Sequence, residues 1–319
     1  MRSMLRTPID LAVSPAVSAV RSPNPEADDF GDCQRTLAHF NHDRLAPGMG
    51  DRPSAAELRR QSRALKLERQ FVEQQRAIIA PLVANVPTAA SGFIKWFENL
   101  RHTGPGQHDP LFKWLATEAR LDQMRWFLEQ EVAGEAGFDD LVALTQVKMP
   151  VRAKLEMARN YWDEMGRGEP KGMHGPMLEQ LADHLHLAPT IETTVAESLA
   201  LGNMMVALAT NRMFAFHAIG ALGVIEMTAP GRAALVTEGL NRLGVPKKQS
   251  HYFALHAVLD VKHSEAWNSE VLLPLVAEDP RRARAIAEGA LLRLWCGKCC
   301  FDRYRQEFGL VGDKPVRAH

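Results

Sequence analysis

Two histidines and an aspartate are spaced along the segment HAVLDVKH so that one helix face can carry all three side chains. These residues, His256, Asp260 and His263, stand at offsets of zero, four and seven. At about 100° per residue, a helix brings such side chains within roughly 60° of one another. Because imidazole and carboxylate are common ligands of iron, manganese and zinc, the triplet predicts part of a metal site. The alternative is a helix with two incidental histidines and a salt-bridging aspartate.

A second pair, Glu164 and His174, flanks a break rich in glycine and proline in the segment WDEMGRGEPKGMHGP. A continuous helix is not expected through this break, so the two side chains can meet only if the chain folds back between them. The alternative interpretation is an ordinary helix end that carries a surface glutamate.

Glu226 is the one acid of an apolar helical segment, MFAFHAIGALGVIEMTAP. A carboxylate in such surroundings is unfavourable unless a cation or hydrogen-bond donors meet it. Glu226 is therefore a further candidate ligand. The alternative is that the helix ends one turn before Pro230, so that Glu226 reaches water.

The acidic segment RWFLEQEVAGEAGFDDL contains Glu129, Glu131 and Glu135. Most of these acids are expected on a solvated helix face. One of them, with Glu131 preferred, is a candidate to turn inward, and the sequence leaves open which of the three does so, if any.

These residues are expected to lie on helices. Apolar residues recur at helical spacing, and no segment shows the sustained alternation of apolar and polar residues that predicts a β-strand. The sequence predicts an all-α protein with one large helical domain over residues 55–308, a flexible or disordered N-terminal arm over 1–54 and a C-terminal tail over 309–319. After a helix that begins near Ser54, helical segments are expected at about 88–103, 110–146, 150–166, 174–186, 191–226, 230–243, 247–276 and 279–308.

Charge and cysteine content narrow the class of protein. The chain has 38 Lys and Arg against 38 Asp and Glu, so nothing in its net charge favours binding to nucleic acid or to an anionic membrane. Its four cysteines are too few and too clustered for a disulfide framework, which favours a reducing, cytoplasmic compartment. No apolar run of transmembrane length is found. Asp10 and Pro15 interrupt the N-terminal segment, so a secretory signal is not expected.

Taken in chain order, the candidate residues resemble the ligand set of the heme-oxygenase-like diiron oxidases and oxygenases, the iron-containing redox enzyme family. The specific signature is His-x3-Asp-x2-His at residues 256–263, preceded by a lone glutamate about thirty residues upstream and by a glutamate and a histidine further upstream. The segment ARNYWDEMGRGEPKGMHGPM is also similar to the family's glutamate-bearing helix and the loop that follows it. The resemblance covers roughly residues 55–308.

The resemblance implies a heme-oxygenase-like helical fold around a non-heme diiron centre, with O2 as co-substrate. Carried over residue by residue, the iron ligands are Glu164, His174, Glu226, His256, Asp260 and His263, with Glu131 as an additional carboxylate of the kind found in members that oxygenate amine nitrogen. Heme is less favoured, because three convergent histidines exceed the one axial ligand that heme needs. No dinucleotide fingerprint is found, so electrons are expected from an external donor such as a ferredoxin or a reductase.

The expected reaction is the oxidation of a small organic substrate, either at an amine nitrogen or at an aliphatic C–H bond. Two alternatives stay open: a metal-free relative similar to thiaminase-like or pyrroloquinoline-quinone-forming proteins, and a non-enzymatic helical binding protein. Homodimer formation is also left open. Cys296, Cys299 and Cys300 lack further ligands for a zinc site, so they are expected to be small packing residues.

Overall fold

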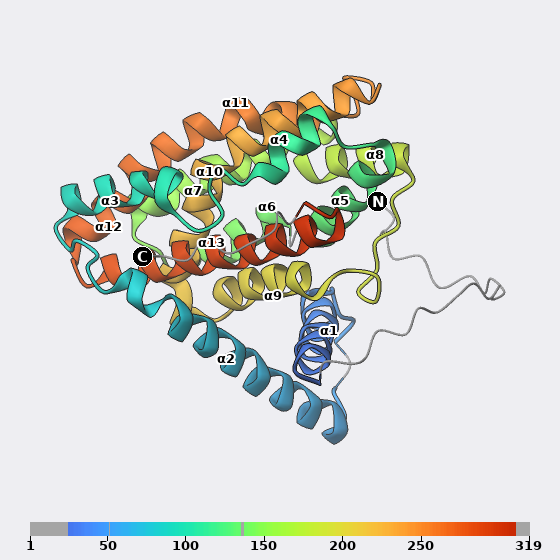
Figure 1. Ribbon diagram of the computed structural model, residues 1–319. Coiled ribbons are helices and arrows are strands. Elements are labelled where there is room, and N and C mark those ends of the chain that lie inside the picture. The colour runs from blue at the N-terminus through green and yellow to red at the C-terminus, as the bar shows by residue number, and fades with distance from the viewer. Residues whose placement is uncertain (1–24, 51, 135–136, 311–319) are drawn as a thin grey trace, which may run out of the picture.

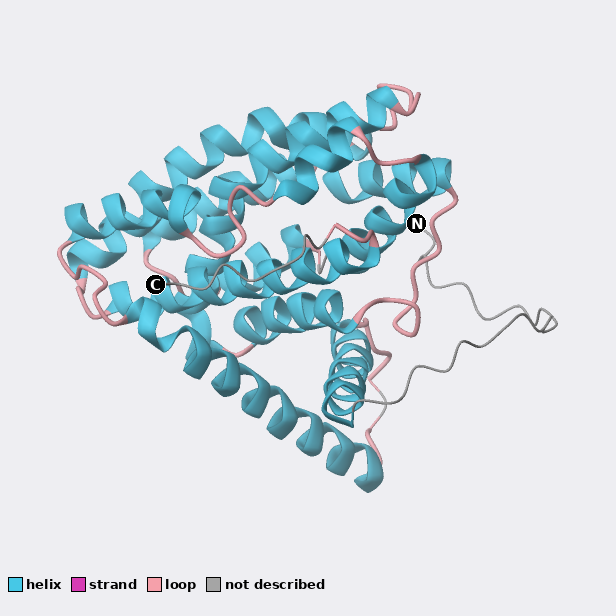
Figure 2. Cartoon of the chain, viewed as in Figure 1, coloured by secondary structure: helices cyan, strands magenta, loops and turns pink. Residues whose placement is uncertain are grey.

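The computed structural model describes residues 25–50, 52–134 and 137–310, and within these ranges it contains helices and loops but no strand (Figure 2). This confirms the predicted all-α class. The α-helices are α1 (Pro25–Leu45), α2 (Ala55–Val83), α3 (Ala90–Thr103), α4 (Pro110–Thr117), α5 (Leu121–Gly134), α6 (Phe138–Thr145), α7 (Val151–Glu164), α8 (His174–Leu185), α9 (Ala196–Thr210), α10 (Ala215–Arg242), α11 (His251–Ala266), α12 (Leu273–Glu278) and α13 (Arg282–Glu307).

Helix α10 is at the centre of the bundle and makes its most extensive contacts with α13 and α11 (Figure 1). Two glycines allow α10 and α13 to touch backbone to backbone. A Cβ added to Gly220 would lie 1.8 Å from the Ile286 carbonyl oxygen, and one added to Gly289 would lie 1.8 Å from that of His217. No larger residue fits at either position, so these two glycines set the distance between the two helices.

The chain breaks its helices at different places from those the sequence predicts. The segment expected to be helical over 110–146 is divided into α4, α5 and α6, and the one expected over 191–226 is interrupted at Asn211. Helix α10 instead runs through Pro230, where a break was expected. Proline lacks an N–H, so the Glu226 carbonyl oxygen four residues earlier loses its usual helical partner, but packing on several sides keeps the helix continuous. Glu226 therefore lies inside a buried helix, away from any helix end.

The flexible arm predicted over residues 1–54 is wrong for residues 25–45, which form α1 and pack against α9 and α2. The buried face of α1 is partly polar. Asn41 Nδ2 donates to Asn203 Oδ1 at 2.8 Å, and Asn203 Nδ2 donates to the Gln34 carbonyl oxygen at 2.9 Å. A face that buries amides in place of apolar residues does not show the apolar period by which a helix is recognised in a sequence. Residues 1–24, and residues 311–319 of the expected tail, lie outside the described residues.

Helix α11 continues without a loop through a π-helical segment, Trp267–Leu272, into α12. Trp267 is buried at the start of this segment, where its indole N–H donates to the Ile219 carbonyl oxygen of α10 at 3.2 Å. The indole lies against Gly223, where an added Cβ would come within 2.6 Å of the ring. The π-helical turn and the indole together fix the C-terminal end of α11 on α10.

One segment, Arg212–Arg242, is long and apolar enough to cross a membrane by length and composition. Its most apolar window is 72% buried inside the protein. This is the burial expected of the central helix of a soluble bundle, which is apolar on nearly all sides because other helices surround it.

Candidate metal centre

Two groups of potential ligands meet in the interior and share one residue. Glu164, His174 and His256 form the first, and Glu164, Glu226 and His263 the second; within each group the ligand atoms lie within 4.8 Å of one another. The residues come from α7, α8, α10 and α11. All are buried except His256, which is partly exposed. Since Glu164 belongs to both groups, its carboxylate lies between two potential cation positions.

The loop after α7 brings His174 back to Glu164. Helix α7 ends at Glu164, and two short 3-10 turns, Gly166–Gly168 and Pro170–Gly172, lead to the start of α8 at His174. The loop closes tightly: Gly166 has a φ of +60°, and a Cβ there would lie 2.3 Å from the Gly172 carbonyl carbon. As a result His174 Nδ1 lies 2.6 Å from Glu164 Oε2. The glycines that interrupt the helix are thus the residues that allow the pair to meet.

Hydrogen bonds to neighbouring groups fix which nitrogen each α11 histidine offers. His256 Nδ1 lies 2.7 Å from the Tyr252 carbonyl oxygen, so it must carry the proton, and Nε2 is left as the potential ligand. His263 Nε2 lies 3.1 Å from Asp163 Oδ2 and donates to it, which leaves Nδ1 for the interior. A carboxylate or carbonyl that holds the far side of a ligating imidazole is typical of metal sites.

Two supporting residues on α7 were not predicted from the sequence. Asn160 Nδ2 donates to Glu226 Oε1 at 2.6 Å, and Asp163 accepts from His263 and also from Arg167 Nε at 2.6 Å. Asn160, Asp163 and Glu164 stand at offsets of zero, three and four, so they share one face of the helix. That spacing in the segment NYWDE was the available signal, although it is also common on solvated helix faces.

Asp260 lies beside these groups without belonging to either. It is 2% exposed, its Oδ1 has no hydrogen-bond partner, and it lines the same cavity as Glu226 and His256. Burial, with the negative charges of Glu226 and Glu164, raises the pKa of Asp260 to about 10. Burial also raises the pKa of Glu226, an effect that the nearby His263 ring, with Nδ1 3.4 Å from Glu226 Oε2, opposes. The site therefore gathers more acidic groups than it can hold ionised without a cation.

The two histidines of α11 respond differently to these surroundings. Burial alone would lower the pKa of His263, but the Glu226 carboxylate, whose Oε2 lies 3.4 Å from His263 Nδ1, and the hydrogen bond to Asp163 raise that pKa to about 9. Burial lowers the pKa of His256, so its ring is neutral at pH 7. The neutral ring is the form that ligates a metal.

The donor set fits metal ions. His174 Nδ1, His263 Nδ1 and Asp260 Oδ1 are buried atoms that have no hydrogen-bond partner within the described part of the chain. His174 Nδ1 and Glu164 Oε2 are close but do not have hydrogen-bond geometry, so both atoms face a common space. Buried polar atoms are rarely left unpaired, and nitrogen and oxygen donors of this kind are what iron and manganese bind.

The structure places Glu131 apart from these groups. It lies on α5, where its Oε1 accepts a hydrogen bond from the Tyr304 hydroxyl at 3.1 Å. Burial raises the pKa of Glu131, and the positive charges of Arg293 and Arg232 oppose this effect. Of the competing acids, Glu129 joins neither ligand group and Glu135 lies outside the described residues. Glu131 lines the cavity, as was preferred from the sequence, but its hydrogen bond is to Tyr304 and the charges that act on it are those of Arg293 and Arg232.

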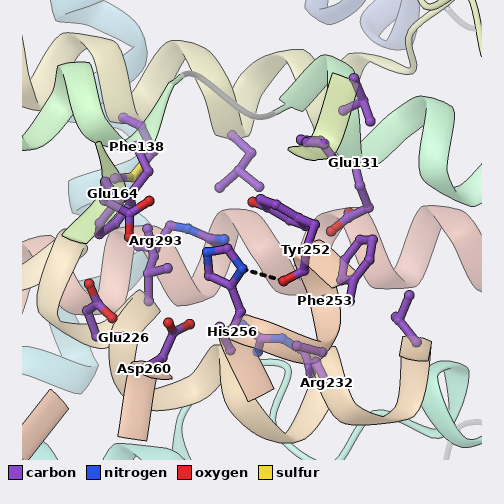
Figure 3. A pocket seen from close by; sticks show the side chains of 18 of the residues that line it. Glu131, Phe138, Glu164, Glu226, Arg232, Tyr252, Phe253, His256, Asp260 and Arg293 are labelled. Carbon is purple, nitrogen blue, oxygen red and sulfur yellow. Dashed lines mark hydrogen bonds between the residues drawn. The ribbon is translucent and has the colours of Figure 1, made fainter. Parts of the chain in front are cut away.

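A cavity of about 150 Å³ connects the ligand groups with Glu131. In Figure 3, Glu164, Glu226 and Asp260 lie on one side of the cavity, Glu131 and Phe253 lie on the other, and Tyr252 and His256 lie between. Its wall is mostly aromatic and aliphatic. A concave apolar site with a few converging polar groups is the usual form of a small-molecule site.

A helical bundle with histidines and carboxylates converging beside an internal cavity defines a class of metal-binding helical proteins, and comparison with known proteins identifies the family. A family model described as iron-containing redox enzyme matches residues 125–298, more than half of the chain. The chain belongs to this family of iron-containing oxidoreductases. A comparison with curated proteins found no match.

A solved structure shows the same fold. A crystal structure of a CADD-like protein of unknown function from Nostoc punctiforme is 18% identical in sequence, with a TM-score of 0.54; the match covers 69% of this chain and 99% of that one. A second crystal structure of that protein is 17% identical, with a TM-score of 0.45, and the match covers 75% of this chain and 95% of that one. With the family match, the first structure confirms the heme-oxygenase-like fold that the sequence predicts.

Proposed function

We propose that the protein is a non-heme diiron oxidase or oxygenase that uses O2 to oxidise a small organic substrate. The observation that carries this proposal is the pair of ligand groups that share Glu164. A single metal needs one such group, whereas a carboxylate common to two groups suits a pair of ions.

Six residues would hold the two irons. Glu164 would contribute to both, with His174 and His256 on one side and Glu226 and His263 on the other. Asp260, buried beside them with an unpaired oxygen, would supply the sixth ligand. Glu131 is not needed in this set. When bound, two reduced irons supply the electrons with which O2 is activated for oxidation of the substrate.

The remaining work falls to the chain itself. Asp163 and the Tyr252 carbonyl hold the histidine rings of α11 in one orientation, and Asn160 holds the Glu226 carboxylate. The apolar cavity wall excludes water and holds the substrate against the ligand groups. Such positioning is how a protein directs a reactive cofactor to one substrate atom.

We also propose which bond is oxidised, what supplies the electrons and in which compartment the reaction occurs. The substrate is oxidised at an amine nitrogen or at an aliphatic C–H bond, and an external ferredoxin or reductase supplies electrons in the cytoplasm. The placement of Glu131 away from the ligand groups supports the six-ligand arrangement over one with a fourth carboxylate, and so favours C–H oxidation.

Anaerobic titration of the metal-free protein with ferrous iron tests the proposal. We expect two irons per chain, and an absorbance change when the ferrous protein meets O2. His263→Ala should lose one iron, because no neighbouring residue offers a nitrogen in its place. His251→Ala is the matched control, since His251 is an exposed residue at the start of the same helix and should leave both irons bound. A wild-type protein that binds no iron, or only one, would rule out the diiron centre.

A further inference from the structure

Two arginines, Arg232 of α10 and Arg293 of α13, also line the cavity, and both charges act on the carboxyl group of Glu131, which lies across the cavity from Glu226 and Asp260. Among the described residues neither arginine takes part in an ion pair with N–O distance of 4.0 Å or less. The Nε of Arg293 is buried without a hydrogen-bond partner, and Arg232 Nη2 donates to the Thr228 hydroxyl at 3.2 Å. Both guanidinium groups therefore have donors that the protein does not use.

The groups around these arginines do not balance their charge. Burial, and then the positive charge of Arg293, lowers the pKa of Arg232 to about 10, so it remains protonated at pH 7. Glu131 is the neighbouring acid and supplies at most one negative charge. Burial raises the pKa of the Cys296 thiol to about 12 and that of Cys300 well above its ordinary value, so both thiols are neutral. At least one positive charge is left without a partner, and such a charge is unfavourable in an apolar cavity.

The two ends of the cavity differ in charge. The carboxyl groups of Glu164, Glu226 and Asp260 lie together on one side of the cavity in Figure 3, whereas the Glu131 carboxyl group on the other side is acted on by the positive charges of Arg293 and Arg232. The ligand end is thus acidic and the arginine end basic.

Aromatic residues contribute much of the cavity wall, and they include Phe112, Phe127, Tyr252 and Phe253. The guanidinium carbon of Arg232 lies 5.8 Å from the centre of the Phe112 ring and 5.5 Å from that of Phe301. Stacking of this kind holds the cation in place while its N–H groups stay available.

We propose that Arg232 and Arg293 bind the carboxylate of an organic acid, and that the apolar part of this acid lies along the aromatic wall toward Glu164 and His256. The planar, forked donors of guanidinium match a carboxylate, and the acid supplies the missing negative charge. The oxidation of the acid rests on the proposed function, whereas its recognition by the arginines does not.

Calorimetric titration of the metal-free, full-length protein tests the recognition step. The probes are 3-phenylpropanoate and its neutral counterpart 3-phenylpropanamide, which differ only in the charged group. Without iron, the carboxylate cannot bind a metal, so any preference for the acid must come from the protein. We expect the acid to bind at least about tenfold more tightly than the amide, the size typical of a charged hydrogen-bonded pair.

Substitution of the two arginines tests whether they cause the tighter binding of the acid. Arg293→Met and Arg232→Met should each weaken acid binding about tenfold or more and leave amide binding unchanged. Arg293→Lys should retain part of the preference because it retains the charge. Glu131→Gln should bind the acid as tightly as the wild type or more tightly, which distinguishes an anion site from a loss of fold. Arg281→Met is the control for a lost surface charge, because the Arg281 side chain is 91% exposed.

Each outcome bears on one proposal. Equal binding of acid and amide, no binding of the acid, or unchanged acid binding in both methionine variants overturns the anion site. Iron stoichiometry is measured on the same proteins. Absence of iron binding with the acid preference intact overturns the diiron proposal alone, and two irons without an acid preference overturns the anion site alone.

Discussion

Single hydrogen bonds decide which atom of each histidine faces the interior of the candidate centre. Asp163 is the clearest case, because its carboxylate accepts from His263 Nε2 while the opposite nitrogen faces Glu226. Asp163→Asn should weaken iron binding about 10- to 100-fold, the usual effect of losing such a partner, while two irons still bind at saturation. Iron titration against a competing chelator measures this.

Asp183→Asn is the control for the loss of one acid, since Asp183 is exposed on α8. Equal iron affinity in the Asp163→Asn and wild-type proteins would show that Asp163 is only a surface partner of Arg167.

The types and order of residues pointed to five side chains that the structure brings together, but not to the residues that support them. Glu164, His174, Glu226, His256 and His263 meet as the resemblance implies. Asn160 and Asp163 were missed because an amide and an aspartate on a helix face are ordinary solvated residues until their partners on α10 and α11 are known. The sequence left open which of three acids turns inward; Glu131 lines the cavity, where its surroundings depend on Tyr304 and on two arginines that lie far from it in the sequence.

At the scale of elements, the contact between α10 and α13 depends on glycine. Gly289→Ala would place a methyl carbon 1.8 Å from the His217 carbonyl oxygen, so one helix must move. We expect this change to lower the free energy of unfolding by about 3 kcal/mol or more. Urea unfolding followed by circular dichroism measures it.

Gly231→Ala is the matched control on the same helix pair. An added Cβ there meets nothing within 4 Å, and Gly231 lies within α10. Because alanine favours the helix, this change should raise the free energy of unfolding by about 0.5–1 kcal/mol. Similar effects of the two substitutions would contradict the close contact.

Helix boundaries were the part of the fold that the sequence predicted least well, and two elements show why. Helix α1 was missed because its inward face carries the amide side chains of Gln34 and Asn41, which form hydrogen bonds with Asn203 of α9. Helix α10 was cut at Pro230, although packing of its neighbours keeps it continuous. A sequence pattern reports the conformational preference of a short segment, and in both helices packing against residues distant in the sequence overrode that preference.

At the scale of the whole molecule, one buried acid links three helices. Glu288 of α13 accepts hydrogen bonds from Arg76 of α2 at 2.7 Å and from Arg284 at 3.0 Å, and it lies 3.1 Å from His217 Nε2 of α10. Burial alone would raise the pKa of Glu288, but the bonds from His217 and Arg76 lower it from 4.5 to about 2. Its ionised form is therefore favoured in the folded state.

This depressed pKa predicts how the stability of the protein depends on pH. The contribution of Glu288 is present above its unfolded pKa of 4.5 and is lost as pH falls toward about 2. It amounts to at most about 3 kcal/mol. Glu288→Gln should thus be less stable than the wild type at pH 7, and the difference should shrink between pH 4.5 and pH 2. Urea unfolding across this pH range measures it, with Glu278→Gln as the surface control. A constant difference would exclude the linkage.

Iron binding should stabilise the molecule unevenly, because the helices depend on the centre to different degrees. The buried residues of helix α11 are Asp260, His263 and Ser264. Its apolar Val258 and Val261 are 66% and 45% exposed. Helix α9 buries ten of its residues and carries none of the proposed ligands. A helix with little buried apolar surface opens readily on its own, so α11 depends most on its ligand contacts.

Since iron binds the folded state, it shifts this local opening equilibrium by mass action. Hydrogen exchange with and without ferrous iron should show slower exchange across residues 251–266 and little change across residues 196–210. His263→Ala should reduce the effect on α11, and His251→Ala should retain it. Equal protection of both helices would mean that iron stabilises the fold only globally, and unchanged exchange in α11 would mean that this helix does not hold the metal.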